Sequence, residues 1–391
     1  MLKKLSLAAL IAMGSMSVAS ATPLTEAIKG VDLSGFLRVR YYNERATSAT
    51  KDHYSYNKWR VTGQFNFVVP VDENIKFVNA YTYDQTVSSN ASGNDVNGVT
   101  NTLGTGVGKD GVQLDQLYMN YSANGLNAIV GKIPVATSVT GSGQGEARGT
   151  GVIAAYKVND NFTAAAGFVD AIYNVNKNAY NNDIYTVAGI FNVDVAKGNI
   201  WYYHLSSLLK SLYTASLDVT PVDGLDMHID YAHSKYVGSI EKTLDDDSKK
   251  AHQYFNISVK FAAAGASVYA GYAATNKGKA PIVLDHDAPI AHVAPTANNN
   301  SIANKRKAKM YYLKAGYNVD AKTNVYVAYQ HQKQDKKYAD YKDDLKLNEY
   351  TIGAKYKYNK KLGFAAYYDI ANWNDDTKDN NEFRFEAKYS F

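Results

Sequence analysis

Apolar and polar side chains alternate along many short stretches of the chain, most clearly in its last nine residues. One face of that stretch is wholly apolar and consists of Phe383, Phe385, Ala387, Tyr389 and Phe391. A period of two indicates a β-strand, and an apolar face opposite a polar one is typical of a transmembrane barrel, where one face meets lipid and the other meets water. The edge strand of a soluble β-sandwich would show the same alternation, so that alternative stays open for this stretch.

The same alternation recurs between turn-forming clusters over the rest of the chain. It is clear in residues 33–41, 59–69, 184–192, 225–231, 253–261, 311–317, 325–329, 348–358 and 362–370, and weaker in residues 75–84, 115–121, 127–133, 151–157, 162–169, 199–205, 211–219 and 266–272. With the terminal stretch these make about 18 strands, and single-chain bacterial barrels have an even number. The sequence therefore predicts an all-β fold, a transmembrane antiparallel β-barrel.

Short turns alternate with long polar segments between the predicted strands. The turns include residues 70–74, 159–161, 221–224, 318–321 and 359–361, and the long segments are 43–57, 85–111, 134–149, 237–250, 275–305 and 334–346. Barrels of this class have short periplasmic turns and longer outer loops. We expect the long segments to lie on the outer side of the membrane, with residues 85–111 and 275–305 as flexible surface because of their glycine, asparagine, serine, proline and histidine content.

The first residues predict export. Two lysines precede an apolar run over residues 5–18, and residues 19–21 (Ala-Ser-Ala) form a small-x-small cleavage site, as in a signal peptide. We expect residues 1–21 to be removed and residues 22–391 to form one barrel domain. The run is shorter than the about 20 apolar residues that a spanning helix needs. The chain has no cysteine, so hydrogen-bonded closure of the barrel has to provide the stability that disulfides give many small secreted domains.

Composition fits the same class. The 391 residues include 33 tyrosines but only 3 tryptophans, and the mean hydropathy is −0.35. Alternating lipid-facing and lumen-facing residues average to a polar value, and tyrosine suits the interfacial girdles of a barrel. A net charge of +5 is too balanced to indicate a nucleic-acid partner.

A barrel of about 18 strands encloses a lumen too wide for inward side chains to fill, so water occupies it unless something plugs it. The sequence shows no plug domain. We therefore expect a loop to fold inward and narrow the lumen, and residues 137–148, with Glu146 and Arg148 among glycine and serine, occupy the third outer loop. A plain surface loop is an equally good interpretation of this segment.

The alternation also predicts which charges face the lumen. The predicted basic residues, on the first, second and last strands that barrel closure makes neighbours, are Arg38, Arg40, Arg60, Arg384 and Lys388. The predicted acidic residues, about half the circumference away, are Asp218, Asp226 and Asp230. Together they would set a transverse field across the pore. The alternative is that charged residues only keep the wall hydrated, and Glu382 and Glu386 dilute the basic cluster.

An enzyme is the second class of function that we considered. Asp226, His228 and Asp230 share one face at a spacing of about 6.6 Å, close enough for a metal site or a dyad. No serine stands out as a nucleophile, and the chain has no phosphate loop, HExxH or EF-hand pattern. We therefore predict a pore lining rather than a catalytic site, and no cofactor, leaving open a divalent cation such as calcium at inward carboxylates.

Surface recognition is the third class. Long outer loops could bind host ligands, with the barrel as their anchor. Lysine-rich residues 305–307 and 333–342 lie near outer strand ends, where they could pair with the lipid A phosphates of lipopolysaccharide, although such runs are often only solvated.

Several segments resemble the Campylobacter-type major outer membrane protein family. They are TPLTEAIKGVDLSGFLRVRYYNE, QLYMNYS, IVGKIPV, GTGV, FAAYYDIANWN and RFEAKYSF. The resemblance implies a homotrimeric, general-diffusion porin of the Gram-negative outer membrane with 18 strands. It also implies passage of small hydrophilic solutes and ions, with a preference for cations.

Overall fold

The structure is a computed structural model that describes residues 30–47, 53–92, 112–141, 148–173, 183–285, 288–339, 343–375 and 379–391. These residues form an 18-stranded antiparallel sheet and two short helices. The strands are β1 (Asp32–Thr47), β2 (His53–Pro70), β3 (Ile75–Ser92), β4 (Val112–Ala123), β5 (Leu126–Pro134), β6 (Arg148–Asn159), β7 (Phe162–Tyr173), β8 (Ile184–Val193), β9 (Ala196–Leu205), β10 (Leu209–Val222), β11 (Leu225–Tyr236), β12 (His252–Ala263), β13 (Ala266–Thr275), β14 (Ala308–Asn318), β15 (Thr323–Gln334), β16 (Leu345–Lys357), β17 (Leu362–Trp373) and β18 (Asn380–Ser390). The helices are α3 (Gly238–Glu241) and α4 (Lys336–Ala339).

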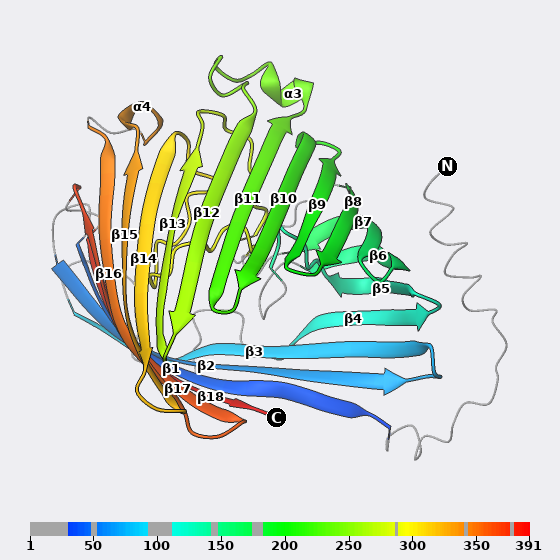
Figure 1. Cartoon of the computed structure of the whole chain (residues 1–391), viewed down its shortest axis with the longest axis horizontal. Coiled ribbons are helices and arrows are strands. Elements are labelled where there is room, and N and C mark those ends of the chain that lie inside the picture. Colours follow the sequence, from blue (N-terminus) through cyan, green and yellow to red (C-terminus); the bar gives the residue numbers. More distant parts are fainter. Residues whose placement is uncertain are drawn as a thin grey trace.

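The sheet closes on itself, because each strand pairs with the next and β18 pairs with β1. Figure 1 shows β1, in blue, and β18, in red, side by side at this seam. Each of the segments predicted from alternation overlaps a different strand, so the predicted fold class is confirmed. Closure leaves no strand edge unpaired, which is what a sheet in lipid requires.

The two ends of the barrel differ as their sequences predict. Tight turns join the strands at one end, and two of them, Asn124-Gly125 and Ala264-Gly265, have φ values of 51° and 79° and of 49° and 81°. Positive φ at both central residues is the type I′ geometry that suits a twisted hairpin. Both α3 and α4 lie at the other end (Figure 1). Within the described ranges, no helix is long and apolar enough to cross a bilayer.

The connection between β13 and β14 corrects one sequence prediction. Residues 275–305 were expected to form flexible outer surface, but the described residues 276–285 and 288–307, here called the interior loop, pack inside the barrel. Ile282, Ile290 and Ile302 are at most 1% exposed, and they cluster with Tyr254 and Met310 of the inner wall. Apolar residues spaced through the Asn-rich segment give the loop a face to bury, which favours packing over exposure.

Candidate functional site

The basic residues predicted to face the lumen lie together on the inner face of β18, β1 and β2. Arg38 is opposite Lys388 across the seam, and Arg40 is opposite Arg60 in the next ladder. The intervening Leu37 and Val39 are 46% and 37% exposed on the outer face. Arg384 lies on the same inner face, with its guanidinium carbon 5.4 Å from the centre of the Tyr367 ring.

Most of these cations are already paired, which the sequence prediction of a bare basic wall did not include. Glu386 accepts a hydrogen bond from Arg40 Nε at 2.5 Å and one from Arg384 at 3.2 Å. Asp84 on β3 binds Arg60 through both carboxylate oxygens. Paired charges create a smaller net field than isolated ones, so this pairing reduces the transverse field that the sequence predicts.

Arg38 and Lys388 also contact a hydroxyl group and an aromatic ring of the inner wall. Arg38 Nε donates to Thr62 Oγ1 at 2.9 Å, and Lys388 Nζ lies 4.6 Å from the centre of the Phe36 ring. The Arg38 guanidinium lies 5.3 Å from the same ring. Both cations therefore lie over the Phe36 ring, each in a cation–π arrangement.

The three predicted acidic residues lie across the barrel on β10 and β11, in unlike environments. Asp218 and Asp226 are 44% and 48% exposed, whereas Asp230 is 3% exposed. Asp226 pairs with Lys260 at 3.1 Å. Asp230 is buried in the wall and therefore does not present a free carboxylate to water.

His228 joins two of these carboxylates. Its Nδ1 lies 2.8 Å from Asp218 and its Nε2 lies 2.7 Å from Asp230, so an imidazolium that donates from both nitrogens satisfies both contacts. Ser216 donates to Asp230 and not to the imidazole, so this is not the serine–histidine arrangement of a hydrolase. Within the described part of the chain, no group of three or more His, Cys, Asp or Glu residues could hold a metal ion.

The described part of the third outer loop packs against the inner wall at β9 and β10. Of residues 135–141, all but Ala136 are buried, and the Ser138 hydroxyl bonds to Tyr203 on β9 and Thr214 on β10 at 3.0 and 2.5 Å. At the base of the loop Arg148 is 3% exposed and pairs with Asp115 at 2.7 Å. Glu146 lies outside the described residues.

The interior loop and residues 135–141 join to cross the lumen. Leu284 N donates to Val139 O at 2.9 Å, and Ile290 N donates to Ser138 O at 3.4 Å. Since residues 135–141 are bound to β9 and β10, the joined segments cover that side of the barrel.

Two buried carboxylates hold the far end of the interior loop. Glu349 on β16 accepts hydrogen bonds from the amides of Asn298 and Asn299 at 3.0 and 3.1 Å. Asp369 on β17 accepts one from the Asn298 side chain at 3.0 Å. Sequence reasoning missed these anchors, although both acidic residues occupy inward positions in predicted strands, which was a usable signal.

Asp247 ties the interior loop to the outer end of the barrel. Its carboxylate pairs with Lys277 at 2.7 Å and Lys337 at 2.8 Å, and Tyr338 donates to it at 2.7 Å. The hydrogen bonds from Lys277, Lys337 and Tyr338 hold the pKa of Asp247 well below its usual range. Hydrogen bonds from Ser248 likewise lower the pKa of Asp245 to about 2.

A carboxyl group with a lowered folded-state pKa stabilises the fold above its unfolded pKa of about 4, and this contribution is lost as the pH falls through the folded value. We expect amide hydrogen exchange in α4 to stay slow from pH 7 to about pH 4 and to accelerate below it, after correction for intrinsic rates. Asp247→Asn should accelerate exchange at neutral pH and remove the acid step. The control is Asp246→Asn, whose carboxylate is 97% exposed; equal exchange in the two variants would contradict the role of Asp247.

The sequence matches the family model of the Campylobacter major outer membrane protein over residues 1–391. The chain belongs to this family. The resemblance seen in the sequence motifs is therefore confirmed over the whole chain, including the middle, where no motif carried it. The family places the barrel in the outer membrane as a porin. Among curated protein sequences, none matches significantly.

Solved structures with the same fold include one whose title calls it a porin. A BenF-like porin from Pseudomonas fluorescens Pf-5 has a TM-score of 0.71 at 12% identity, covering 93% of this chain and 99% of that one. Pseudomonas aeruginosa OccK3 (OpdO) has a TM-score of 0.69 at 14% identity, covering 94% and 97%. Acinetobacter baumannii OccAB4 has a TM-score of 0.67 at 12% identity, covering 92% and 98%. At these identities the likeness is one of fold.

Proposed function

We propose that this porin is a water-filled channel for the passive diffusion of ions and small hydrophilic solutes. The observation that carries the proposal is that inward charged side chains retain contact with water: Arg60, Asp84 and Asp218 are 37%, 32% and 44% exposed. The joined interior segments narrow the lumen on the side of β9 and β10. Solutes would therefore pass beside the wall of β18, β1 and β2.

Swelling of proteoliposomes in solutions of neutral sugars tests this proposal. Liposomes that contain folded protein should swell at a rate that falls as the sugar becomes larger, because the interior segments limit the cross-section. Liposomes with heat-denatured protein are the control. Equal swelling of the two preparations would contradict a diffusion channel.

Cation preference, which the family resemblance implies, is part of the proposal, with Arg38, Arg40, Arg60, Arg384 and Lys388 as the filter that moderates it. The double variant Arg38→Gln/Arg60→Gln should raise the permeability of potassium over chloride about twofold, because two positive charges leave the passage and Asp84 loses its partner. The reversal potential in a salt gradient measures this. The control variant Lys309→Gln/Lys346→Gln removes the same charge from the outer face of the barrel and should leave the reversal potential unchanged. If the double Arg variant has the same reversal potential as this control, Arg38 and Arg60 are not part of the filter.

Assembly and processing complete the proposal. The homotrimer implied by the family would form through outward apolar faces, such as that of Leu33, Leu37 and Val39, and crosslinking of the native membrane protein tests it. Cleavage after Ala21 and contact of outer lysines with lipopolysaccharide are proposed on the sequence alone. Lys305 donates to Gln332 at 2.6 Å on the inner wall and is therefore left out of the proposed lipid contact. The proposal keeps Lys307 and the lysines of residues 333–342.

The two other functional classes receive less support. The interior loop was the longest candidate for a recognition surface, and its burial inside the barrel removes that segment from an adhesin. A hydrolase of the serine type would need a serine that donates to His228, but Ser216 donates to Asp230 instead. We therefore propose no catalytic role for the Asp218, His228 and Asp230 cluster, and assign it to bracing β10 against β11.

A further inference from the structure

A basic cavity lies at the short-turn end of the inner wall. Its volume is about 810 Å³, and its lining includes the turns after β14 and β16 and parts of β16 to β18. The lysines in the lining are Lys322, Lys355, Lys357, Lys360, Lys361 and Lys388. The interior loop is anchored at Glu349 and Asp369, toward the other end of β16 and β17. The cavity is therefore separate from the constriction.

The two carboxylates in the lining do not neutralise these lysines. Asp320 accepts hydrogen bonds from the amides of Lys322 and Thr323 at 2.6 and 2.7 Å, which caps the turn. Glu386 pairs with Arg40 and Arg384. Within the described part of the chain, none of the six lysines forms an ion pair with a carboxylate, so the cavity carries a concentrated positive charge.

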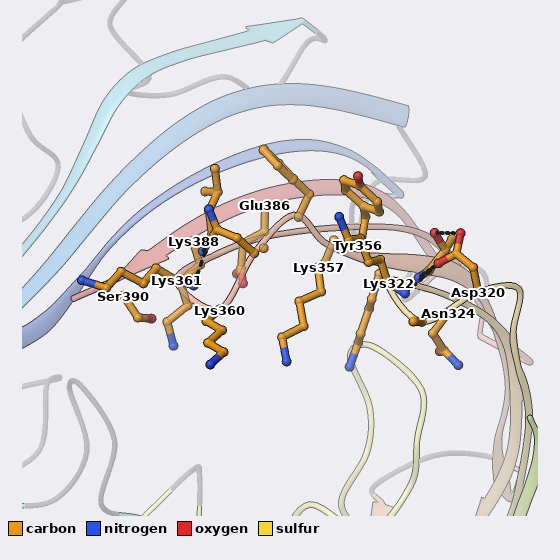
Figure 2. Close-up of a pocket in the computed structure, with 18 of the residues that line it drawn as sticks. Asp320, Lys322, Asn324, Tyr356, Lys357, Lys360, Lys361, Glu386, Lys388 and Ser390 are labelled. Carbon is orange, nitrogen blue, oxygen red and sulfur yellow. Dashed lines mark hydrogen bonds between the residues drawn. The ribbon is translucent and has the colours of Figure 1, made fainter.

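Small residues on β17 open a trough between the lysines. Gly363 is paired with Lys357 on one side and with Lys388 on the other, so the two lysines are two strand spacings apart, about 10 Å. A Cβ at Gly363 would meet only Tyr356 O, at 3.7 Å. Ala365, the next inward residue, lies beside Lys355. Figure 2 shows Lys357, Lys360 and Lys361 extending from the wall to the same side.

We propose that this cavity is a binding site for small multivalent anions, that is, solutes that carry two or more phosphate or carboxylate groups. The proposal rests on the porin function. It adds a class of solute that would bind in the channel at the end of the barrel with the short turns. Lysine ammonium groups are point charges, whereas arginine would impose a bidentate geometry. A site whose cationic groups are all lysines therefore selects by charge and tolerates different shapes, as a diffusion channel requires.

Such a site should depend strongly on ionic strength. The screening length falls from about 10 Å at 0.1 M salt to about 3 Å at 1 M. Because the lysines act together across a span of about 10 Å, binding should weaken steeply over that range. A neutral sugar has no charge to exploit and should not bind.

Isothermal titration calorimetry on folded protein in detergent tests the site without requiring conduction. The probes are inorganic triphosphate and citrate, with sucrose as the neutral probe. The first variant, Lys355→Gln/Lys357→Gln, removes charge, and the second, Gly363→Leu, fills the trough without changing charge. The matched control is Lys309→Gln/Lys346→Gln, which removes the same charge from the outer face of β14 and β16.

We expect both site variants to bind triphosphate and citrate at least about tenfold more weakly than the wild type, which corresponds to about 1.4 kcal/mol, and the control to bind like the wild type. If the wild type binds triphosphate but not citrate, the site takes phosphates and the carboxylate part of the proposal is wrong. Equal affinity in all variants, or no binding in a wild type that conducts, would overturn the site and leave the porin function intact. Binding without conduction would overturn the porin function and leave the site.

Discussion

Replacing residues 278–305 with a short Gly-Ser linker is expected to raise the single-channel conductance by about twofold or more, because the interior loop then no longer narrows the lumen. The replacement is compatible with the barrel, since Lys307 N donates to Asn276 O at 2.6 Å and the two ends of the segment already adjoin. β13 and β14 can thus remain a hairpin. Conductance in a planar bilayer measures the effect.

A milder variant separates the presence of the loop from its attachment. Asn298→Ala/Asn299→Ala keeps the chain length but removes the side-chain bonds to Asp369 and Glu349, which measure 3.0 and 2.8 Å. We expect a wild-type mean conductance with more frequent current fluctuations, because the loop is held less firmly. A correctly folded barrel that lacks residues 278–305 and conducts like the wild type would show that the interior loop is not the constriction.

The second large effect is on stability. A methyl group added at Gly271 on β13 would overlap the ring of Tyr312 on β14. Tyr312 is 3% exposed and donates to Asn256 at 2.6 Å, and Asn256 in turn donates to Asp230 at 3.1 Å. The ring therefore cannot move aside without breaking this chain of hydrogen bonds. We expect Gly271→Ala to lower the free energy of unfolding by about 1–3 kcal/mol, the usual cost of overpacking.

Gly363→Ala is the matched control, because the added carbon meets nothing closer than 3.7 Å. Both substitutions reduce the conformational entropy of the unfolded chain equally, so the difference between them isolates the clash. Denaturant unfolding in detergent, followed by tryptophan fluorescence, gives the two free energies. Equal stability of the two variants would mean that Tyr312 can be displaced at little cost.

The barrel could be predicted from the sequence because each strand carries its own signal. A period of two places the exposed Leu37 and Val39 outside and Arg38 and Arg40 inside, and no distant contact is needed to see it. The interior loop could not be predicted in the same way. Residues 298–300 are three consecutive asparagines, which are typical of surface turns, and their partners Glu349 and Asp369 are about 50 and 70 residues away in sequence.

The sequence was enough to predict which charged residues face the lumen, but not which of them form ion pairs with each other. Alternation placed Arg60 on the inner face, yet its partner Asp84 depends on the register between β2 and β3, which contains an irregularity between Trp59 and Arg60. A shift of one residue in register reverses every side chain of a strand. Pairs across strands therefore need the structure, and so does the cavity that Gly363 opens between Lys357 and Lys388.

Single-channel current from purified, detergent-folded residues 22–391 in a planar bilayer under a salt gradient tests the central claim most directly. The account predicts stepwise, long-lived openings whose reversal potential reports the ion preference of the passage beside β18, β1 and β2. A folded protein that inserts into the bilayer but carries no current would contradict an open diffusion channel.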